Sequence, residues 1–193
     1  MAPDDPQSRQ PRSPVLRTNA QIGAACTTTQ NSGPLCSITV TKIPLRRFTA
    51  RVLPIDPENR VLLLHGFDPA VPDRPFWFTI GGALEGSETL QEAAARELYE
   101  EVGIRAAVEE ISGPHWSRMT SFDFAQYTFT QDETFLAVRV DGEGAVSFEH
   151  MEQVEKETTL SYRWWSAEEL DATEETVHPE NLGELLRKIV QES

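Results

Sequence analysis

The sequence predicts an α/β protein in which helices cover a mixed β-sheet. Segments with strand composition dominate the middle of the chain, whereas helical periodicity marks its flanks. These segments do not follow a regular alternation of strand and helix, so we expect a mixed sheet. With 193 residues, of which 39% are hydrophobic, the chain is long enough for one domain with its own core.

Residues 1–44 are predicted to be a disordered leader. This segment is rich in proline, poor in large apolar side chains and lacks a sustained period of 2 or 3.6. No secretory signal is legible, and the uncharged segment 18–41 is too polar to be a membrane helix. Cys26 and Cys36 are too few for a disulfide scaffold. We therefore expect a cytoplasmic protein whose folded domain spans residues 45–193.

Strands open the folded domain. Residues 48–54 and 61–65 have strand composition, and the polar residues 56–59 between them predict a turn. After a proline-rich loop, residues 76–80 predict an aromatic strand that ends at Gly81 and Gly82.

An amphipathic helix follows the two glycines. Thr89 is the predicted N-cap, because Glu92 three residues later completes a capping box, and Gly103 supplies the stop. The apolar stripe of this helix recurs at i, i+4 spacing and consists of Leu90, Ala94, Leu98 and Val102.

The rest of the chain returns to strands and ends in helices. Strand composition marks residues 107–111, 117–129, 134–140 and 163–165. Turns are expected at residues 112–114 and 141–144, and helical periodicity at residues 167–170 and 182–190.

The charge of the chain restricts its partners. Seventeen Lys and Arg stand against 31 Asp and Glu, which gives a formal net charge of −14. Residues 1–45 hold four basic and two acidic side chains, so the remaining 148 residues carry −16. Long nucleic acids and acidic membrane surfaces attract basic proteins. The composition therefore argues against both partners.

Three carboxylates share one face of the predicted helix. At about 100° per residue, Glu97, Glu100 and Glu101 fall in an arc of roughly 100°. Like charges at this spacing repel one another, and the helix contains no Lys. A solvated acidic surface is one interpretation. The other is a site for Mg²⁺ or Mn²⁺, which prefer carboxylate oxygens, with the upstream glycines allowing backbone carbonyls to approach the ion.

The same segment resembles the Nudix box, whose pattern is G-x5-E-x7-R-E-U-x-E-E-x-G-U with U an aliphatic residue. Gly82 is followed after five residues by Glu88, and after seven more by Arg96-Glu97-Leu98-Tyr99-Glu100-Glu101-Val102-Gly103-Ile104. Every fixed position matches. Nine specified positions over 23 residues make the pattern far more specific than a glycine-rich loop.

The resemblance implies a Nudix-type α/β/α sandwich and a hydrolase of phosphoanhydride bonds. Such enzymes cleave a nucleoside diphosphate linked to another moiety, with Mg²⁺ or Mn²⁺ as cofactor. The resemblance implies that Glu97, Glu100 and Glu101 bind the metal, and that the Gly81 carbonyl is a further ligand. It also implies that Arg96 orients these carboxylates by hydrogen bonds and that Glu88 holds Arg96.

The sequence does not identify the general base or the residues that contact the substrate. A box glutamate or one acid from a later segment could serve as the base, and the later acids are Glu149, Glu152, Glu155 and Glu157. Trp77 is a weak prediction for stacking on a nucleobase, because core packing explains the aromatic strand equally well. Trp116, Arg118 and Tyr127 are similar candidates, for which a structural role is the stronger interpretation.

Two alternatives accompany the enzyme hypothesis, and the first is an acidic interaction domain without enzymatic activity. The second is a catalytically silent Nudix-fold module that binds a nucleotide, although such modules usually lose box acids. The chain could also form a homodimer, as many Nudix proteins do, but no dimer surface is legible. The downstream markers of ADP-ribose, dinucleoside polyphosphate and NADH hydrolases are absent, so the substrate is not assigned.

Overall fold

The computed structural model describes residues 42–142 and 146–192, all of which lie in one unit, Val40–Ser193. These residues form eight strands, four α-helices and one 3-10 turn. In chain order they are β1 Ile43–Ile55, β2 Val61–Gly66, β3 Phe76–Phe78, β4 Ile80–Ala83, α1 Leu90–Val102, η1 Val108–Glu110, β5 Ser112–Phe124, β6 Tyr127–Arg139, α2 Gln153–Thr158, β7 Thr159–Trp165, α3 Ala167–Ala172, β8 Val177–His178 and α4 Leu182–Glu192.

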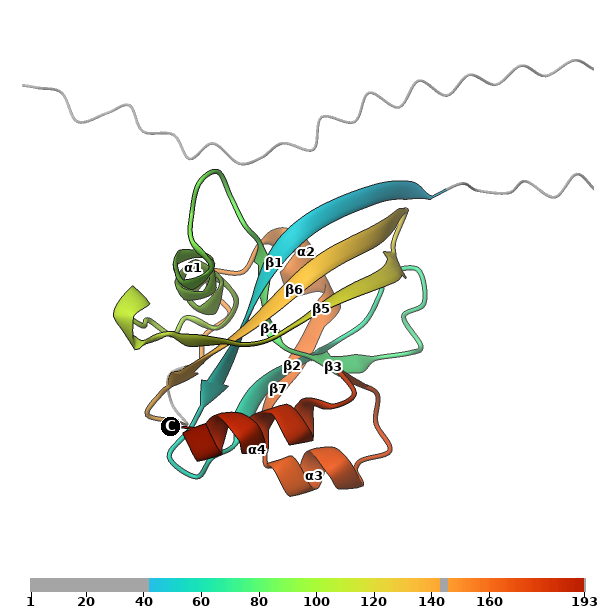
Figure 1. Ribbon diagram of the computed structural model, residues 1–193. Coiled ribbons are helices and arrows are strands. Elements are labelled where there is room, and N and C mark those ends of the chain that lie inside the picture. The colour runs from blue at the N-terminus through green and yellow to red at the C-terminus, as the bar shows by residue number, and fades with distance from the viewer. Residues whose placement is uncertain (1–41, 143–145, 193) are drawn as a thin grey trace, which may run out of the picture. The chain divides into compact units, whose positions relative to one another are not determined.

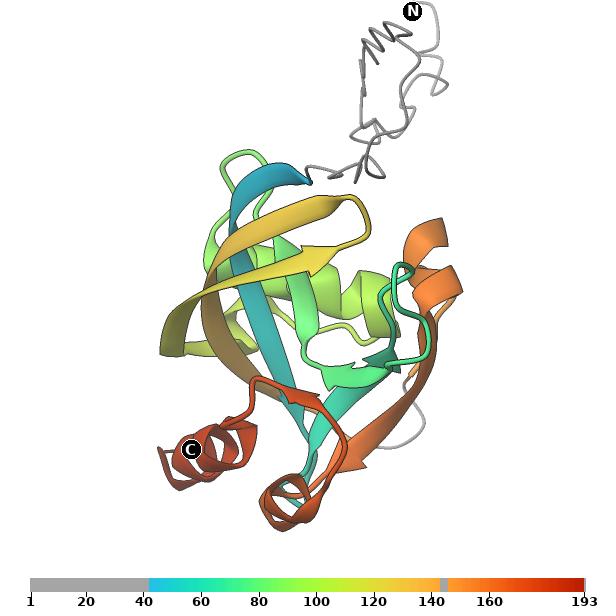
Figure 2. The same cartoon turned by 90° about the vertical axis from the view of Figure 1, so that its right-hand side faces the viewer.

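The strands form one mixed sheet around β1. Strand β1 runs parallel to β6 along its whole length and antiparallel to β2 and β4. The path continues from β6 to β5 on one side and from β2 through β3 to β8 on the other, with β7 paired to β2. Figures 1 and 2 show that the long strands curl rather than lie flat. The predicted mixed sheet is confirmed.

Two hydrophobic clusters cover the two faces of this sheet. Ala50 and Val52 of β1 pack against α1, whereas Leu53 and Ile55 belong to a second cluster with α3 and α4. Alternation along a strand sends neighbouring side chains to opposite faces, which explains the split. In Figure 1, α1 lies beside β1 and β4, apart from α3 and α4. The helices therefore sit on both faces, as the predicted α/β/α sandwich requires.

Helix α1 begins and ends where the sequence predicts. The Glu92 N–H donates to Thr89 Oγ1 at 3.2 Å, and Glu92 Oε2 accepts from the Thr89 N–H at 2.7 Å. Gly103 has φ +73°, a conformation that glycine adopts without the steric cost of a Cβ, and its N–H reaches the Tyr99 carbonyl. The capping box and the glycine stop are confirmed.

Three predictions about the other elements are wrong or incomplete, and one helix is not predicted. Residues 107–111 contain the short η1 turn instead of a strand, and the expected turn at 112–114 lies within β5. The expected strand 117–129 is the hairpin of β5 and β6, which turns at Ala125 with φ +49°. Asp68 Oδ1 accepts the Ala125 N–H at 2.9 Å, so a distant loop stabilises this turn. The sequence does not predict helix α2, because its six residues show little periodicity.

The predicted leader falls mainly outside the described residues. Residues 1–41 are not among them, so the prediction of disorder stays a prediction there. Strand β1 begins at Ile43, two residues before the predicted start of the folded domain at residue 45.

Candidate active site

Helix α1 buries two carboxylates against strand β4. Glu97 and Glu101 are only 7% and 6% exposed, although both carry the same formal charge. They are four residues apart and therefore lie on one face of the helix. Glu100 belongs to the same acidic arc but keeps 43% of its side chain exposed. The helix thus offers two buried acids and one accessible acid.

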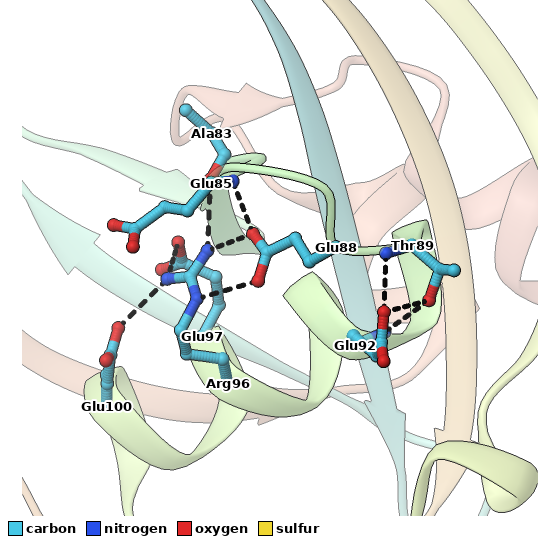
Figure 3. Close-up of polar contacts among 8 residues, drawn as sticks. All are labelled: Ala83, Glu85, Glu88, Thr89, Glu92, Arg96, Glu97 and Glu100. Carbon is cyan, nitrogen blue, oxygen red and sulfur yellow. Dashed lines mark hydrogen bonds and ion pairs between the residues drawn. The ribbon is translucent and has the colours of Figure 1, made fainter.

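Arg96 holds the acids of the box together (Figure 3). Its Nη2 and Nε donate to the two oxygens of Glu88 at 2.7 and 3.2 Å. Its Nη1 donates to Glu97 Oε1 at 2.7 Å and to Glu100 Oε2 at 3.1 Å, and Nη2 also reaches the Ala83 carbonyl. We call Arg96 and its three carboxylate partners the clamp. The structure brings together the residues that the resemblance assigns to it, and Glu88 holds Arg96 by two hydrogen bonds.

The glycine pair of β4 makes room for the carboxylates. A Cβ at Gly82 would lie 2.3 Å from Glu97 Oε1, so only glycine allows this carboxylate to pack against the strand. The Gly81 N–H donates to Glu101 Oε1 at 3.1 Å. The Gly81 carbonyl accepts from Arg51 Nη1 at 2.7 Å. The Gly81 carbonyl oxygen has a second lone pair that could bind a metal ion. This contact stays a prediction.

Burial makes the two inner carboxylates costly to ionise. Burial raises the pKa of Glu97, while Arg96 acts in the opposite direction. Burial raises the pKa of Glu101 well above its ordinary value, and the neighbouring charge of Glu97 adds to this effect. Hydrogen bonds from Arg96 lower the pKa of Glu88. Burial therefore disfavours the charged forms of Glu97 and Glu101, and Arg96 offsets this cost for Glu97 but donates no hydrogen bond to Glu101.

The donor set fits a hard divalent cation. Glu101 Oε2 is buried and has no hydrogen-bond partner, so one acceptor of the site is left without a donor. Between residues 42 and 192, apart from the short undescribed segment 143–145, no three acidic, His or Cys side chains are already gathered around a common point. Arg96 explains this, because it draws Glu97 and Glu100 toward itself. Carboxylate oxygens of Glu97, Glu100 and Glu101 could hold Mg²⁺ or Mn²⁺ once Glu97 and Glu100 turn from Arg96 toward the ion.

One later acid lies within electrostatic reach of the box. The sequence leaves four of these later acids as candidates for the general base, namely Glu149, Glu152, Glu155 and Glu157. Burial is the main reason that the pKa values of Glu97 and Glu101 are raised, and the Glu155 charge adds to both. Burial also raises the pKa of Glu155, with Glu152 and Glu100 contributing. Among these four acids, Glu155 is therefore the one whose charge acts on the acids of α1.

Trp77, the weak candidate for stacking on a nucleobase, packs in the core, and a contact with a nucleobase stays a prediction. Its side chain is 6% exposed and belongs to the cluster under α3 and α4, on the sheet face away from α1. The indole stacks on His65 at 4.4 Å between ring centroids and meets Trp165 edge to face. Its Nε1 donates to Glu175. Trp77 is a core residue, because alternation along β3 turns it toward the second cluster.

The three weaker candidates have structural contacts, as their stronger interpretation predicts. Trp116 packs against Phe135 with ring centroids 5.0 Å apart. Arg118 Nε donates to Glu133 Oε2 at 2.6 Å. Tyr127 lies 5.8 Å from Phe129, centroid to centroid, near the turn of the hairpin.

Sequence reasoning missed a polar network beside Gly81. Arg51 Nε donates to Glu133 Oε1 at 3.0 Å, and Arg51 Nη2 donates to Gln131 Oε1 at 3.1 Å. Gln131 and Glu133 are buried within strand β6. Buried polar residues at alternate positions of a strand are an unusual signal, since the core side of a strand is normally apolar.

Replacing Gly82 with Ala should displace Glu97 and lower kcat/KM by about 100-fold, because small misplacements of reacting groups carry penalties of this size. The matched control is Gly86→Ala. Gly86 has φ +55°, so the control also strains the backbone, but its added methyl meets nothing within 4 Å. Steady-state hydrolysis of one substrate by both variants is the measurement. Equal activity of the two variants would show that the close approach of Glu97 to Gly82 is not needed.

Comparisons with known proteins agree with this geometry. A family model described as NUDIX domain matches residues 45–188. A dihydroneopterin triphosphate diphosphatase of Escherichia coli strain K12 is 27% identical over 109 residues, which are 56% of this chain and 70% of the relative. Among solved structures, a MutT protein of Methanosarcina mazei Go1 is 20% identical, with a TM-score of 0.52 and coverage of 78% of this chain and 96% of that one.

The structure of the Escherichia coli dihydroneopterin triphosphate pyrophosphohydrolase is similar to the same degree. It is 22% identical, with a TM-score of 0.52, and the match covers 79% of this chain and 100% of that chain. At these identities the structural likeness concerns the fold. No helix in the described part of the chain is long and apolar enough to cross a membrane.

The family model spans well over half of the chain and includes the whole segment from Gly82 to Ile104. The observed sandwich and the clamp of box residues on α1 are consistent with that match. The chain therefore belongs to the Nudix hydrolase family, which acts on diphosphate bonds.

Proposed function

We propose that the protein is a metal-dependent pyrophosphohydrolase that cleaves a nucleoside diphosphate linked to another moiety. The observation that carries this proposal is the pair of buried acids, Glu97 and Glu101, of which Glu101 keeps one oxygen without a partner. Bound Mg²⁺ or Mn²⁺ would neutralise charge on the diphosphate and increase the acidity of a bound water. Glu97, Glu100 and Glu101 would hold that ion.

The other box residues position these ligands. Arg96 fixes the rotamers of Glu97 and Glu100, and Glu88 in turn fixes Arg96. Such supporting contacts typically account for about one to two powers of ten in metal affinity or activity. Because Arg96 contacts three carboxylates, we assign it to positioning rather than to substrate.

We assign the general base to Glu155. It is the later acid whose charge acts on Glu97 and Glu101, and its own side chain is partly buried. Glu155 Oε2 accepts the Glu152 N–H at 2.9 Å, which holds the carboxylate in place at the start of α2. A carboxylate in this position would accept the proton of the attacking water.

The substrate class is a small nucleotide derivative. The acidic surface repels long polyanions, whereas a short diphosphate can enter with its charge compensated by the bound cation. One relative is named for its action on dihydroneopterin triphosphate, so this compound belongs in a test panel beside nucleoside triphosphates and nucleoside diphosphate derivatives. Whether two copies of the chain associate stays a prediction that sedimentation would test.

A substrate panel tests this function. The protein is incubated with each compound in Mg²⁺, in Mn²⁺ and in EDTA, and products are identified by mass spectrometry. We expect cleavage of a diphosphate bond in one or more compounds, with activity lost in EDTA. Tight binding without turnover across the whole panel would instead identify a silent nucleotide-binding module and would refute the enzyme proposal.

A further inference from the structure

A layer of polar side chains covers one face of the strands β1, β6 and β5. It is the face that carries the second hydrophobic cluster, and the layer meets the box at Gly81. Side chains two residues apart on a strand share a face, and the register pairs Arg47 with Gln131, and both Thr49 and Arg118 with Glu133. We call this set the polar layer, and its members are Arg47, Thr49, Arg51, Arg118, Gln131 and Glu133. Toward the core the same face continues with Phe135, and toward the hairpin turn with Phe129.

The polar layer has more positive than negative charge. Glu133 takes both Arg51 and Arg118 as ion-pair partners, at 2.9 and 2.6 Å. Arg47 has no carboxylate partner among the described residues, and its guanidinium lies over the Phe129 ring at 4.3 Å from the centroid. Three arginines and one glutamate therefore leave an excess of two positive charges, in a chain whose net charge is −14.

Three buried atoms of the polar layer lack hydrogen-bond partners. They are Arg47 Nε, Thr49 Oγ1 and Gln131 Nε2, and the last two belong to residues with 0% exposure. The Arg47 and Gln131 atoms can only donate, and the Thr49 hydroxyl can donate as well. Unpaired buried donors destabilise a protein unless a ligand supplies acceptors. The free donors, together with the surplus positive charge, indicate a ligand rich in anionic oxygen.

The polar layer is continuous with the carboxylates of α1. Arg51 donates to the Gly81 carbonyl, and the Gly81 N–H donates to Glu101, so a single glycine separates the two groups. Burial and the nearby Arg51 lower the pKa of Arg47 to about 10, while Glu97 and Glu133 act in the opposite direction. The box carboxylate Glu97 therefore interacts electrostatically with Arg47.

We propose that Arg47, with Gln131 and Thr49, binds an oxyanion of the substrate's phosphate chain. This inference rests on the proposed function and deepens it, because it assigns a residue that recognises the phosphates independently of the acids of α1. The guanidinium stays on Phe129 and presents its free Nε to a phosphate oxygen, while Gln131 Nε2 and Thr49 Oγ1 gain the acceptor that they lack. The surplus positive charge of the polar layer is then compensated by the ligand.

The neighbouring Arg46 provides a matched control. It lies on the opposite face of β1, its side chain is 65% exposed, and it pairs with Asp132 at 3.0 Å. Arg46→Ala therefore removes the same charge from the chain, one residue away, without touching the polar layer. Arg47→Lys keeps the charge but loses the planar fork, and Arg47→Gln keeps a planar side chain over Phe129 without the charge.

The test is calorimetric titration with imidodiphosphate, a diphosphate that resists hydrolysis and carries no base, in the presence of Mg²⁺. We expect Arg47→Ala and Arg47→Gln to weaken binding at least tenfold, Arg47→Lys to do so by a smaller factor, and Arg46→Ala to stay within twofold of wild type. Hydrolysis of a substrate from the panel should show a matching rise in KM, with kcat changed by less than threefold. Thermal unfolding of each variant verifies folding, and Arg47→Gln replaces Arg47→Ala if the latter unfolds.

The outcomes separate this inference from the proposed function. Equal affinities of the Arg47→Gln and Arg46→Ala variants, or no binding by wild type, would overturn the assignment of Arg47. If wild type cleaves no compound of the panel but binds imidodiphosphate through Arg47, the enzyme proposal fails and the phosphate site holds. If wild type is active and Arg47→Gln leaves KM unchanged, the phosphate site fails and the enzyme proposal holds.

Discussion

Replacing Glu101 with Gln should lower kcat by about 1,000-fold while making the metal-free protein more stable. The first effect follows because the neutral amide would be a weaker ligand than the carboxylate at the most buried position of the site. A bound metal typically supplies several kcal/mol of transition-state stabilisation, and a loss of about 4 kcal/mol corresponds to roughly three powers of ten in rate. Steady-state kinetics at saturating Mg²⁺ measure this effect.

The second effect follows from the raised pKa of Glu101, which burial causes and the Glu97 charge increases. A carboxyl group whose pKa is higher in the folded than in the unfolded state stabilises the fold least at high pH. The free energy of unfolding therefore falls as the pH rises from the ordinary value of 4.5 toward the raised pKa. Glutamine cannot ionise, so the variant should gain roughly 3 °C in Tm at neutral pH in EDTA, about 1 kcal/mol for a chain of this size. The gain should vanish near pH 4, because the Glu101 carboxyl group is then largely protonated in both the folded and the unfolded state.

Magnesium should reverse the order of stability. Wild type should gain Tm with Mg²⁺, because a ligand that binds only the folded state stabilises it by mass action, whereas the variant should gain little. Glu109→Gln is a suitable control, since Glu109 is an exposed residue of η1. Full activity of the Glu101 variant would contradict the assignment of Glu101 as a metal ligand. A lower Tm than wild type in EDTA would contradict the cost of ionising this buried carboxyl group.

The part of the site that lies in one helix could be predicted from the sequence. The spacing of Glu97, Glu100 and Glu101 fixes their shared face, because a helix has a constant period. Arg96 and Glu88 also come from the same short segment, so their contacts need no knowledge of the tertiary fold. The capping box at Thr89 and the stop at Gly103 are local for the same reason.

The rest of the site depends on contacts between distant segments. Arg51 and Glu133 are 82 residues apart, and their contact requires the parallel register of β1 with β6. The packing of Trp77 under α3 and α4 could not be predicted, because alternation gives two faces of a strand without saying which one these helices cover. Glu155 stands out from the other late acids only in the folded chain, where it is partly buried and its charge acts on the acids of α1. Sequence periodicity carries no information on such pairings.

Replacing Glu155 with Gln should lower kcat by about 100-fold and leave KM within about threefold. Proton transfer to a positioned base typically contributes between roughly 100-fold and 10,000-fold to a rate, and a glutamine side chain cannot accept the proton. The carbonyl oxygen of the new amide can still accept the Glu152 N–H, so the start of α2 should keep its structure. Affinity for imidodiphosphate with Mg²⁺ should also stay unchanged, because the variant removes a proton acceptor rather than a phosphate contact.

The same segment supplies controls of equal charge. Glu157 accepts a hydrogen bond from Gln153 Nε2 at 2.7 Å, and Glu149 is an exposed residue before α2. Each change to Gln removes one negative charge near residue 155, so a general electrostatic effect on the substrate would appear in all three variants. If the base is Glu155, only its variant loses kcat. A similar loss in the Glu157 variant would reduce the role of Glu155 to surface charge, and full activity of the Glu155 variant would return the base to a carboxylate of the box.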